Sequence, residues 1–184
     1  MAHKLSTLDQ AWLDAAKTND TQRLFACFTQ GANTRATDKN GDNAAIWLAR
    51  RGNGDAVIRL GTLAPKTLTQ GNNYGWTAAI LLAFQNRASH IFRLTLLNPK
   101  QLEHISFGGW SVAICLTFCD NISAVLKLAE IHPAVKQQTG VIEAAIYQKH
   151  PEMIAAFIKA GYAQPHDINE RLEDVGLSWD DISS

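Results

Sequence analysis

The sequence lacks the features that mark several common protein classes. It has only three cysteines, Cys27, Cys115 and Cys119, and no CxxC pair, so it offers no disulfide framework and indicates a reducing compartment. Its longest apolar run, Ala78–Phe84, is far too short to span a bilayer, so we expect no membrane insertion. No apolar segment follows the first residues, so we expect a cytoplasmic protein without a secretory signal. A bacterial effector delivered into a host cytosol would also need no such signal.

An excess of charge of one sign is also missing. The chain has 17 Lys and Arg against 17 Asp and Glu, and charged residues make up only 18% of it. This balance argues against a nucleic-acid binder that works by neutralising phosphates. The hydrophobic fraction of 46% is enough for a folded core, so bulk disorder is excluded. Residues 162–184 stand apart, since they hold six acidic residues and one basic residue.

Familiar catalytic and metal-binding motifs are absent too. There is no GxSxG, no HExxH and no phosphate-binding Gly-Lys-Ser/Thr sequence. Cys115 and Cys119 lie four residues apart, but no second ligand pair has the spacing of a zinc site, and Cys115 falls on an expected core position. We therefore expect no catalytic residue, metal or cofactor. The alternative is an enzyme or metal protein that uses Cys119 with a histidine.

What the sequence does contain is an internal repeat. Gly41, Gly75 and Gly109 are each 34 residues apart, and each begins a similar nine-residue segment. The segments are GDNAAIWLA, GWTAAILLA and GWSVAICLT. A second similarity, VIRL, IFRL and VLKL, recurs at the same spacing. Three copies in one phase indicate a repeat architecture.

Each repeat unit is predicted to form two short helices. Asn43, Thr77 and Ser111 stand where a helix N-cap is expected, directly before an apolar run. A polar break then precedes a second amphipathic stretch in each unit. Neither helix can bury its apolar face alone, so we expect an all-α protein whose core lies between stacked units.

This pattern resembles the ankyrin repeat family. The period, the two helices and the glycine-bearing turn all match, as do Gly31-Ala32-Asn33 and the final Lys159-Ala160-Gly161. The family's Thr-Pro-Leu-His tetrapeptide is replaced, for instance by Thr77-Ala-Ala-Ile80. The segments around Ala64-Pro65 and Ala134–Thr139 are irregular. The resemblance implies five divergent repeats within residues 1–163, at about 8–37, 38–70, 71–104, 105–134 and 135–163.

Residues 164–184 fall outside the repeats. Ile168, Leu172, Leu177 and Trp179 offer apolar side chains that could cover the open end of the last repeat, which would make this acidic segment a C-terminal cap. A partner-binding tail anchored by Trp179 is the alternative.

The resemblance also implies where a partner would bind. In the family, the turn tips and the exposed side of the first helix, which line a concave face, contact partners. Two units of this chain place aromatic residues at those positions, with a charged flank beside them. The expected partner-binding residues are Tyr74, Trp76, Phe84, Phe107, Trp110 and Phe118, flanked by Lys39, Asp42, Arg50 and Arg51. The alternative is that these rings only pack against each other and replace the lost proline and histidine.

These features predict a non-enzymatic, monomeric protein–protein interaction module that acts as an adaptor, inhibitor or effector. Its preformed surface would bind a protein partner at little ordering cost. A weaker alternative is nucleic-acid binding through Lys17, Lys39, Arg50 and Arg51 with aromatic stacking.

Overall fold

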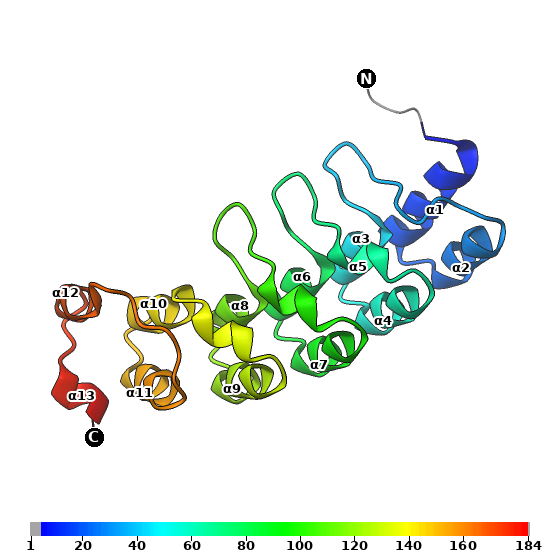
Figure 1. Cartoon of the computed structure of the whole chain (residues 1–184). Helices are drawn as coiled ribbons and strands as arrows, with labels where there is room; N and C mark the ends of the chain where they lie inside the picture. The colour runs from blue at the N-terminus through cyan, green and yellow to red at the C-terminus, as the bar shows by residue number, and fades with distance from the viewer. Residues whose placement is uncertain (1–4, 184) are drawn as a thin grey trace.

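Helices in two layers form the protein. The computed structural model describes residues 5–183, and every regular element in that range is helical. The first layer consists of α1 (Thr7–Thr18), α3 (Ala44–Arg50), α6 (Ala78–Phe84), α8 (Val112–Phe118) and α10 (Gly140–Tyr147). The second consists of α2 (Thr21–Thr29), α4 (Gly54–Leu63), α7 (Ala88–Leu97), α9 (Ile122–Ile131) and α11 (Pro151–Lys159). Each first-layer helix contacts the next one, so the helix pairs stand in a row (Figure 1).

Short elements follow several of the second-layer helices. These are α5 (Lys66–Thr69) and the two 3₁₀ helices η1 (Pro99–Glu103) and η2 (Pro133–Gln137). The chain then ends in α12 (Ile168–Asp174) and α13 (Trp179–Ser183). The two segments that looked irregular in the sequence therefore hold α5 and η2.

Small side chains let the first-layer helices approach one another. Ala45 and Ala49 of α3 and Ala79 and Ala83 of α6 are buried between neighbouring helices. The second layer contributes larger apolar residues at the same 34-residue spacing. These are Val57 and Leu60, Ile91 and Leu94, and Val125 and Leu128, all of them buried. The core therefore runs continuously along the row, because each helix pair buries its apolar faces against the next.

The expected N-caps are confirmed. The side chain of Asn43 accepts a hydrogen bond of 2.9 Å from the amide of Ile46. Thr77 and Ser111 do the same for α6 and α8, at 3.4 and 3.2 Å. Each bond satisfies one of the free amides at a helix start, which fixes where the first helix of the repeat begins.

Three loops project from the row before α3, α6 and α8 (Figure 1). We call them loop 1 (residues 38–42), loop 2 (residues 72–76) and loop 3 (residues 106–110). Each has a glycine with a positive φ of 77–81° at its fourth position, a conformation that favours glycine. Each closes through a backbone hydrogen bond from its first amide to its last carbonyl: Asp38 to Asp42, Asn72 to Trp76 and Ser106 to Trp110.

No such loop precedes α10. The link from α9 is instead the short η2, followed by Gln138. The side-chain Nε2 of Gln138 donates to the carbonyl of Leu102 at 2.8 Å, and its Oε1 accepts from the Ser111 hydroxyl at 2.7 Å. The side chain of Gln138 thus connects the segment before α10 to the preceding repeat, at the place where a fourth loop would lie.

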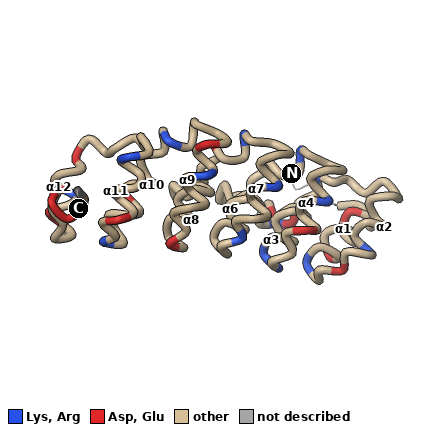
Figure 2. The backbone as a smooth tube through the Cα atoms, turned by 90° about the horizontal axis from the view of Figure 1, so that it is seen from below, with Lys and Arg blue, Asp and Glu red and all other residues tan. Residues whose placement is uncertain are grey.

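The acidic C-terminal segment packs partly against the last helices. Ile168, Leu172 and Ile182 are buried, and Leu177 is partly buried against the core. Trp179 is 42% exposed, and its indole Nε1 donates to Asn169 at 2.8 Å. Figure 2 shows acidic residues at α12, next to this end of the chain, and basic residues at the end of α3.

Candidate binding surface

Two positions recur in each central repeat and face one another. One is the residue after the loop glycine, and the other is the last residue of the first-layer helix. In the third and fourth repeats these positions hold Trp76 with Phe84 and Trp110 with Phe118, whose ring centroids lie 6.3 and 5.1 Å apart. Loops 2 and 3 therefore each pack against the end of the helix that follows them through an aromatic contact.

The aromatic pairs of neighbouring repeats join into one row. Trp76 and Trp110 stack with centroids 6.4 Å apart and planes 25° from parallel. Phe84 meets Trp110 edge-on at 6.3 Å. Phe118 contacts Tyr147, at the end of α10, at 6.0 Å. We call Trp76, Phe84, Trp110, Phe118 and Tyr147 the aromatic row. The expectation that rings one period apart become neighbours is correct for the two tryptophans, since they stack.

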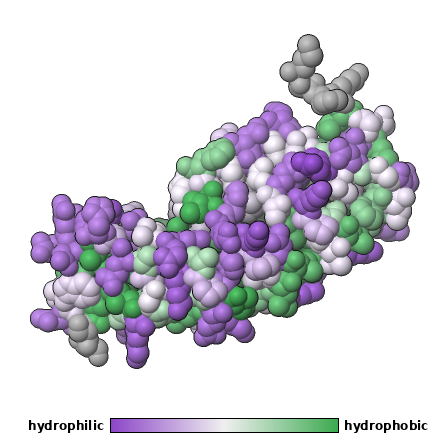
Figure 3. Space-filling model, in the orientation of Figure 1, coloured by the Kyte–Doolittle hydropathy of each residue, from purple (hydrophilic) through white to green (hydrophobic). Residues whose placement is uncertain are grey.

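The aromatic row is only partly covered. Phe84 and Tyr147 are 57% and 76% exposed, whereas Trp76, Trp110 and Phe118 are partly buried. Two further rings stand at the loop tips, where Tyr74 is 64% and Phe107 84% exposed. Figure 3 shows hydrophobic surface on and beside loop 3. Because these rings pack on one another, their positions are already defined before a partner binds. Binding at their exposed faces would therefore cost little conformational entropy.

A charged cluster adjoins the row at the second repeat. Here the two recurring positions hold Asp42 and Arg50, which form an ion pair of 3.1 Å. Trp47 lies beside them, with Lys17 and Arg50 over its ring at 5.5 and 5.8 Å from the centroid. Its indole nitrogen donates to Asp38 at 3.0 Å. Cation–π contacts and this hydrogen bond fix Trp47 between charged side chains.

The four residues of the expected charged flank have different environments. Lys39 and Arg50 are exposed, at a loop tip and at the end of α3. Asp42 is 1% exposed, pairs with Arg50 and accepts a hydrogen bond of 2.7 Å from the side-chain Nδ2 of Asn72, so it connects loop 1 to loop 2. Arg51 is exposed, but its Nε donates to the carbonyl of Lys17 at 2.7 Å. Of the flank, Lys39, Arg50 and Arg51 are therefore accessible at the surface.

Arg51 belongs to a further column that joins successive repeats. The equivalent side chain in later repeats reaches the carbonyl of the second small residue of the previous first-layer helix. Gln85 donates to Ala49 at 2.8 Å and Gln148 to Thr117 at 2.9 Å. Cys119 makes the same contact to Ala83 through sulfur at 3.7 Å. The column satisfies carbonyls at helix ends, so its main role is structural.

The thiols have the surroundings of packing residues. Cys27 and Cys115 are buried, as expected for core positions. Burial, together with the nearby Cys119, raises the pKa of Cys115 to about 12. Burial also raises the pKa of Cys119 above its usual range. Both thiols are thus held in the protonated form at neutral pH, which opposes nucleophilic chemistry.

Two histidines, His132 and His150, hold structural positions. His150 accepts from the amide of Met153 and lies 3.1 Å from Asp120, and His132 pairs with Glu103 at 2.8 Å. Within residues 5–183, no group of three or more His, Cys, Asp or Glu side chains is arranged to hold a metal ion. No helix in the same range combines the length and the apolar character needed to cross a membrane.

Trp47 was not among the predicted site residues. The equivalent residues one and two repeats later are Leu81 and Cys115, so the repeat gives no aromatic pattern at this position. Tyr147 ends α10 as Phe84 and Phe118 end α6 and α8, and this shared helix-end position was its signal in the sequence. The chain matches no protein-family model, and none of the curated proteins it was compared with is similar to it.

Proposed function

We propose that this chain is a non-enzymatic module that binds another protein, built as an ankyrin-type solenoid of five repeats with a C-terminal cap. The 34-residue spacing, the paired helices and the three glycine-bearing loops support this architecture. An adaptor, an inhibitor and an effector would all use such a module in the same way.

The observation that carries the proposal is the aromatic row. Five rings from three successive first-layer helices and from loops 2 and 3 follow one another at 5.1–6.4 Å. An exposed apolar surface of this continuity is uncommon on a monomer and usually marks an interface. Tyrosine and tryptophan are also typical anchors of protein interfaces, because they bury large areas at little entropic cost.

Charge at the row's edge suggests how a partner is oriented. Lys39 and Arg51 are exposed, and neither forms an ion pair within residues 5–183. A partner with an apolar strip and acidic residues at one end would match this surface. The rim charges would then contribute more to orientation and association rate than to affinity.

The test compares a variant within the aromatic row with a control variant outside it. Trp110→Ala interrupts the aromatic row, whereas Leu96→Ala removes an apolar side chain that is 79% exposed on α7 of the second layer. We expect affinity capture with the wild type and with Leu96→Ala to retain the same partner, and capture with Trp110→Ala to lose it. Circular dichroism of both variants should remain helical. Equal retention by all three proteins, or unfolding of Trp110→Ala, would contradict the proposal.

A further inference from the structure

The three loops are joined to one another by backbone hydrogen bonds. The amide of Asn73 in loop 2 donates to the carbonyl of Asn40 in loop 1 at 3.0 Å. The amide of Phe107 in loop 3 donates to the carbonyl of Tyr74 in loop 2 at 3.1 Å. Loops 1 and 2 therefore each accept one backbone hydrogen bond from the loop that follows, at positions 34 residues apart.

Loop 3 has no following loop. By the same spacing its acceptor is the carbonyl of Gly108, and no donor within residues 5–183 is bonded to it. The surroundings of the loop glycines differ accordingly. A Cβ on Gly41 would lie 2.8 Å from the amide nitrogen of Asn73, and one on Gly75 would lie 3.0 Å from that of Phe107. A Cβ on Gly109 would meet nothing within 4 Å, so the face that is covered on loops 1 and 2 is open on loop 3.

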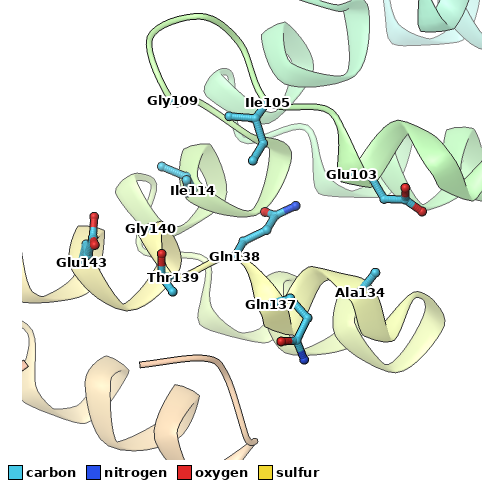
Figure 4. Close-up of a pocket in the computed structure, with 10 residues that line it drawn as sticks. All are labelled: Glu103, Ile105, Gly109, Ile114, Ala134, Gln137, Gln138, Thr139, Gly140 and Glu143. Atoms are coloured by element: carbon cyan, nitrogen blue, oxygen red, sulfur yellow. The ribbon is translucent and has the colours of Figure 1, made fainter. Parts of the chain in front are cut away.

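A pocket occupies the place of the absent loop. It has a volume of about 410 Å³ and lies between loop 3 and the start of α10 (Figure 4). Ile105 and Ile114 give it an apolar side, and Gln138, Thr139 and Glu143 supply polar groups. The side chain of Ile105 is 49% exposed. The pocket thus combines apolar surface with the open face of Gly109, the residue after the unpaired Gly108 carbonyl.

The aromatic row is incomplete at the same place. In the third and fourth repeats, the ring after the loop glycine packs on the ring that ends the first-layer helix. Tyr147 ends α10 in this way, but Gln138 precedes the N-cap Thr139 where Trp76 and Trp110 precede theirs. Tyr147 therefore contacts only Phe118 among aromatic rings of the described chain and is 76% exposed.

We infer that this gap receives a tight, glycine-bearing turn of the partner protein, which completes the array as a fourth loop. The turn donates one backbone N–H to the carbonyl of Gly108 and places an aromatic side chain against Trp110 and Tyr147. Backbone addition of this kind gives affinity from the main chain and specificity from one side chain. The inference rests on the proposed function and specifies which part of a partner enters this end of the aromatic row.

A cyclic peptide with the sequence of residues 105–111, ISFGGWS, serves as the probe, because loop 3 makes the required contacts to loop 2. In a titration followed by two-dimensional amide NMR, we expect shifts at Gly108, Gly109, the Trp110 indole and Gly140. An absence of shifts at these positions in a large excess of peptide would overturn the inference.

Two methylated peptides separate backbone pairing from simple hydrophobic contact. Methylation of the peptide nitrogen of the phenylalanine removes the donor that Phe107 uses in the chain itself. Methylation at the first glycine removes an N–H that forms no hydrogen bond in loop 3. The first peptide should bind about fivefold more weakly, as expected for one lost hydrogen bond, and the second should bind as the parent does. Equal weakening by both would contradict the proposed pairing.

A loop graft tests the location. Insertion of Asn-Asn-Tyr-Gly-Trp, the sequence of loop 2, between Gln138 and Thr139 places a tryptophan before Thr139 as Trp76 precedes Thr77. The graft should abolish the peptide-induced shifts, and Tyr147→Ser should weaken binding of the peptide in a chain without insertion. Unchanged peptide binding in both variants would overturn the inference. If the graft still bound the natural partner while Trp76→Ala did not, the proposed function would stand and this inference would fail.

Discussion

Asp42 and Arg50 form an ion pair, 3.1 Å between Oδ2 and Nε, at the two positions that Trp76 and Phe84 occupy one repeat later. The same backbone geometry thus brings a charged pair together in one repeat and an aromatic pair in the next. The loop is fastened to the helix end in both cases, but only the aromatic version leaves apolar surface for a partner. This exchange explains why the aromatic row begins at the third repeat.

The first prediction concerns the strength of this fastening. Asp42→Ala removes a buried acceptor from Arg50 and from the side-chain Nδ2 of Asn72, so we expect a loss of about 1–3 kcal/mol in the free energy of unfolding. Arg50→Ala should cost less, because Arg50 is exposed. Urea unfolding of both single variants and the double variant should give a coupling energy of about 0.5–3 kcal/mol. Strictly additive effects would mean that the pair contributes nothing to the fold.

The second prediction separates rings that hold the fold from rings that only face outward. Phe107 is 84% exposed at a loop tip, so Phe107→Ser should change the free energy of unfolding by less than about 0.5 kcal/mol. Trp110→Ala removes contacts with Trp76, Phe84 and Phe118 and should cost more, since aromatic pairs contribute about 0.5–1.5 kcal/mol each beyond burial. Thermal unfolding of the two variants gives the comparison. A larger loss for Phe107→Ser would show that the loop tip is packed in solution.

The local features of the repeats could be predicted from the sequence. N-caps at Asn43, Thr77 and Ser111 depend on a side chain and an amide three residues later, so the signal lies within one short segment. The contact between Trp76 and Trp110 could be predicted because the two residues are separated by one period of the repeat. Period and capping are properties of the chain itself, and stacked units convert them directly into spatial contacts.

Contacts that break the period could not be predicted in this way. The charged surroundings of Trp47 depend on Lys17 and Asp38, which come from two different parts of the chain and have no counterpart in later repeats. The burial of Asp42 likewise depends on Asn72 in the next loop. The open face of Gly109 results from a loop that the fifth repeat lacks, and only the three-dimensional arrangement shows what that leaves uncovered.

The third prediction distinguishes a C-terminal cap from a partner-binding tail. Leu172 of α12 is 1% exposed, so Leu172→Ala should lower the free energy of unfolding by about 2–5 kcal/mol if the segment covers the last repeat in solution. Glu173→Ala, at the neighbouring exposed position, is the control and should have little effect. Urea denaturation measures both. Equal stability of the two variants would favour a tail that is not packed on the row.

The fourth prediction is a loss of stability in alkaline solution that depends on Cys115. Burial raises the pKa of this thiol to about 12, whereas an unfolded chain has a thiol pKa of about 8.5. The folded state therefore holds its proton at a pH where the unfolded state has lost it, and stability falls as the pH rises through that interval. This contribution is complete below about pH 8.5 and disappears toward pH 12.

Cys115→Ala provides the comparison, because it removes the thiol while the buried Tyr162, whose pKa burial also raises, remains in both proteins. The variant should be less stable at neutral pH, since it leaves a small cavity, but its stability should fall less steeply with pH above about 8.5. Urea unfolding at a series of pH values gives the two slopes. A pulse of iodoacetamide on the native protein should also label the partly exposed Cys119 before Cys115, as read by peptide mass spectrometry. Parallel slopes together with early labelling of Cys115 would show that this helix opens in solution and that the thiol is not held in the core.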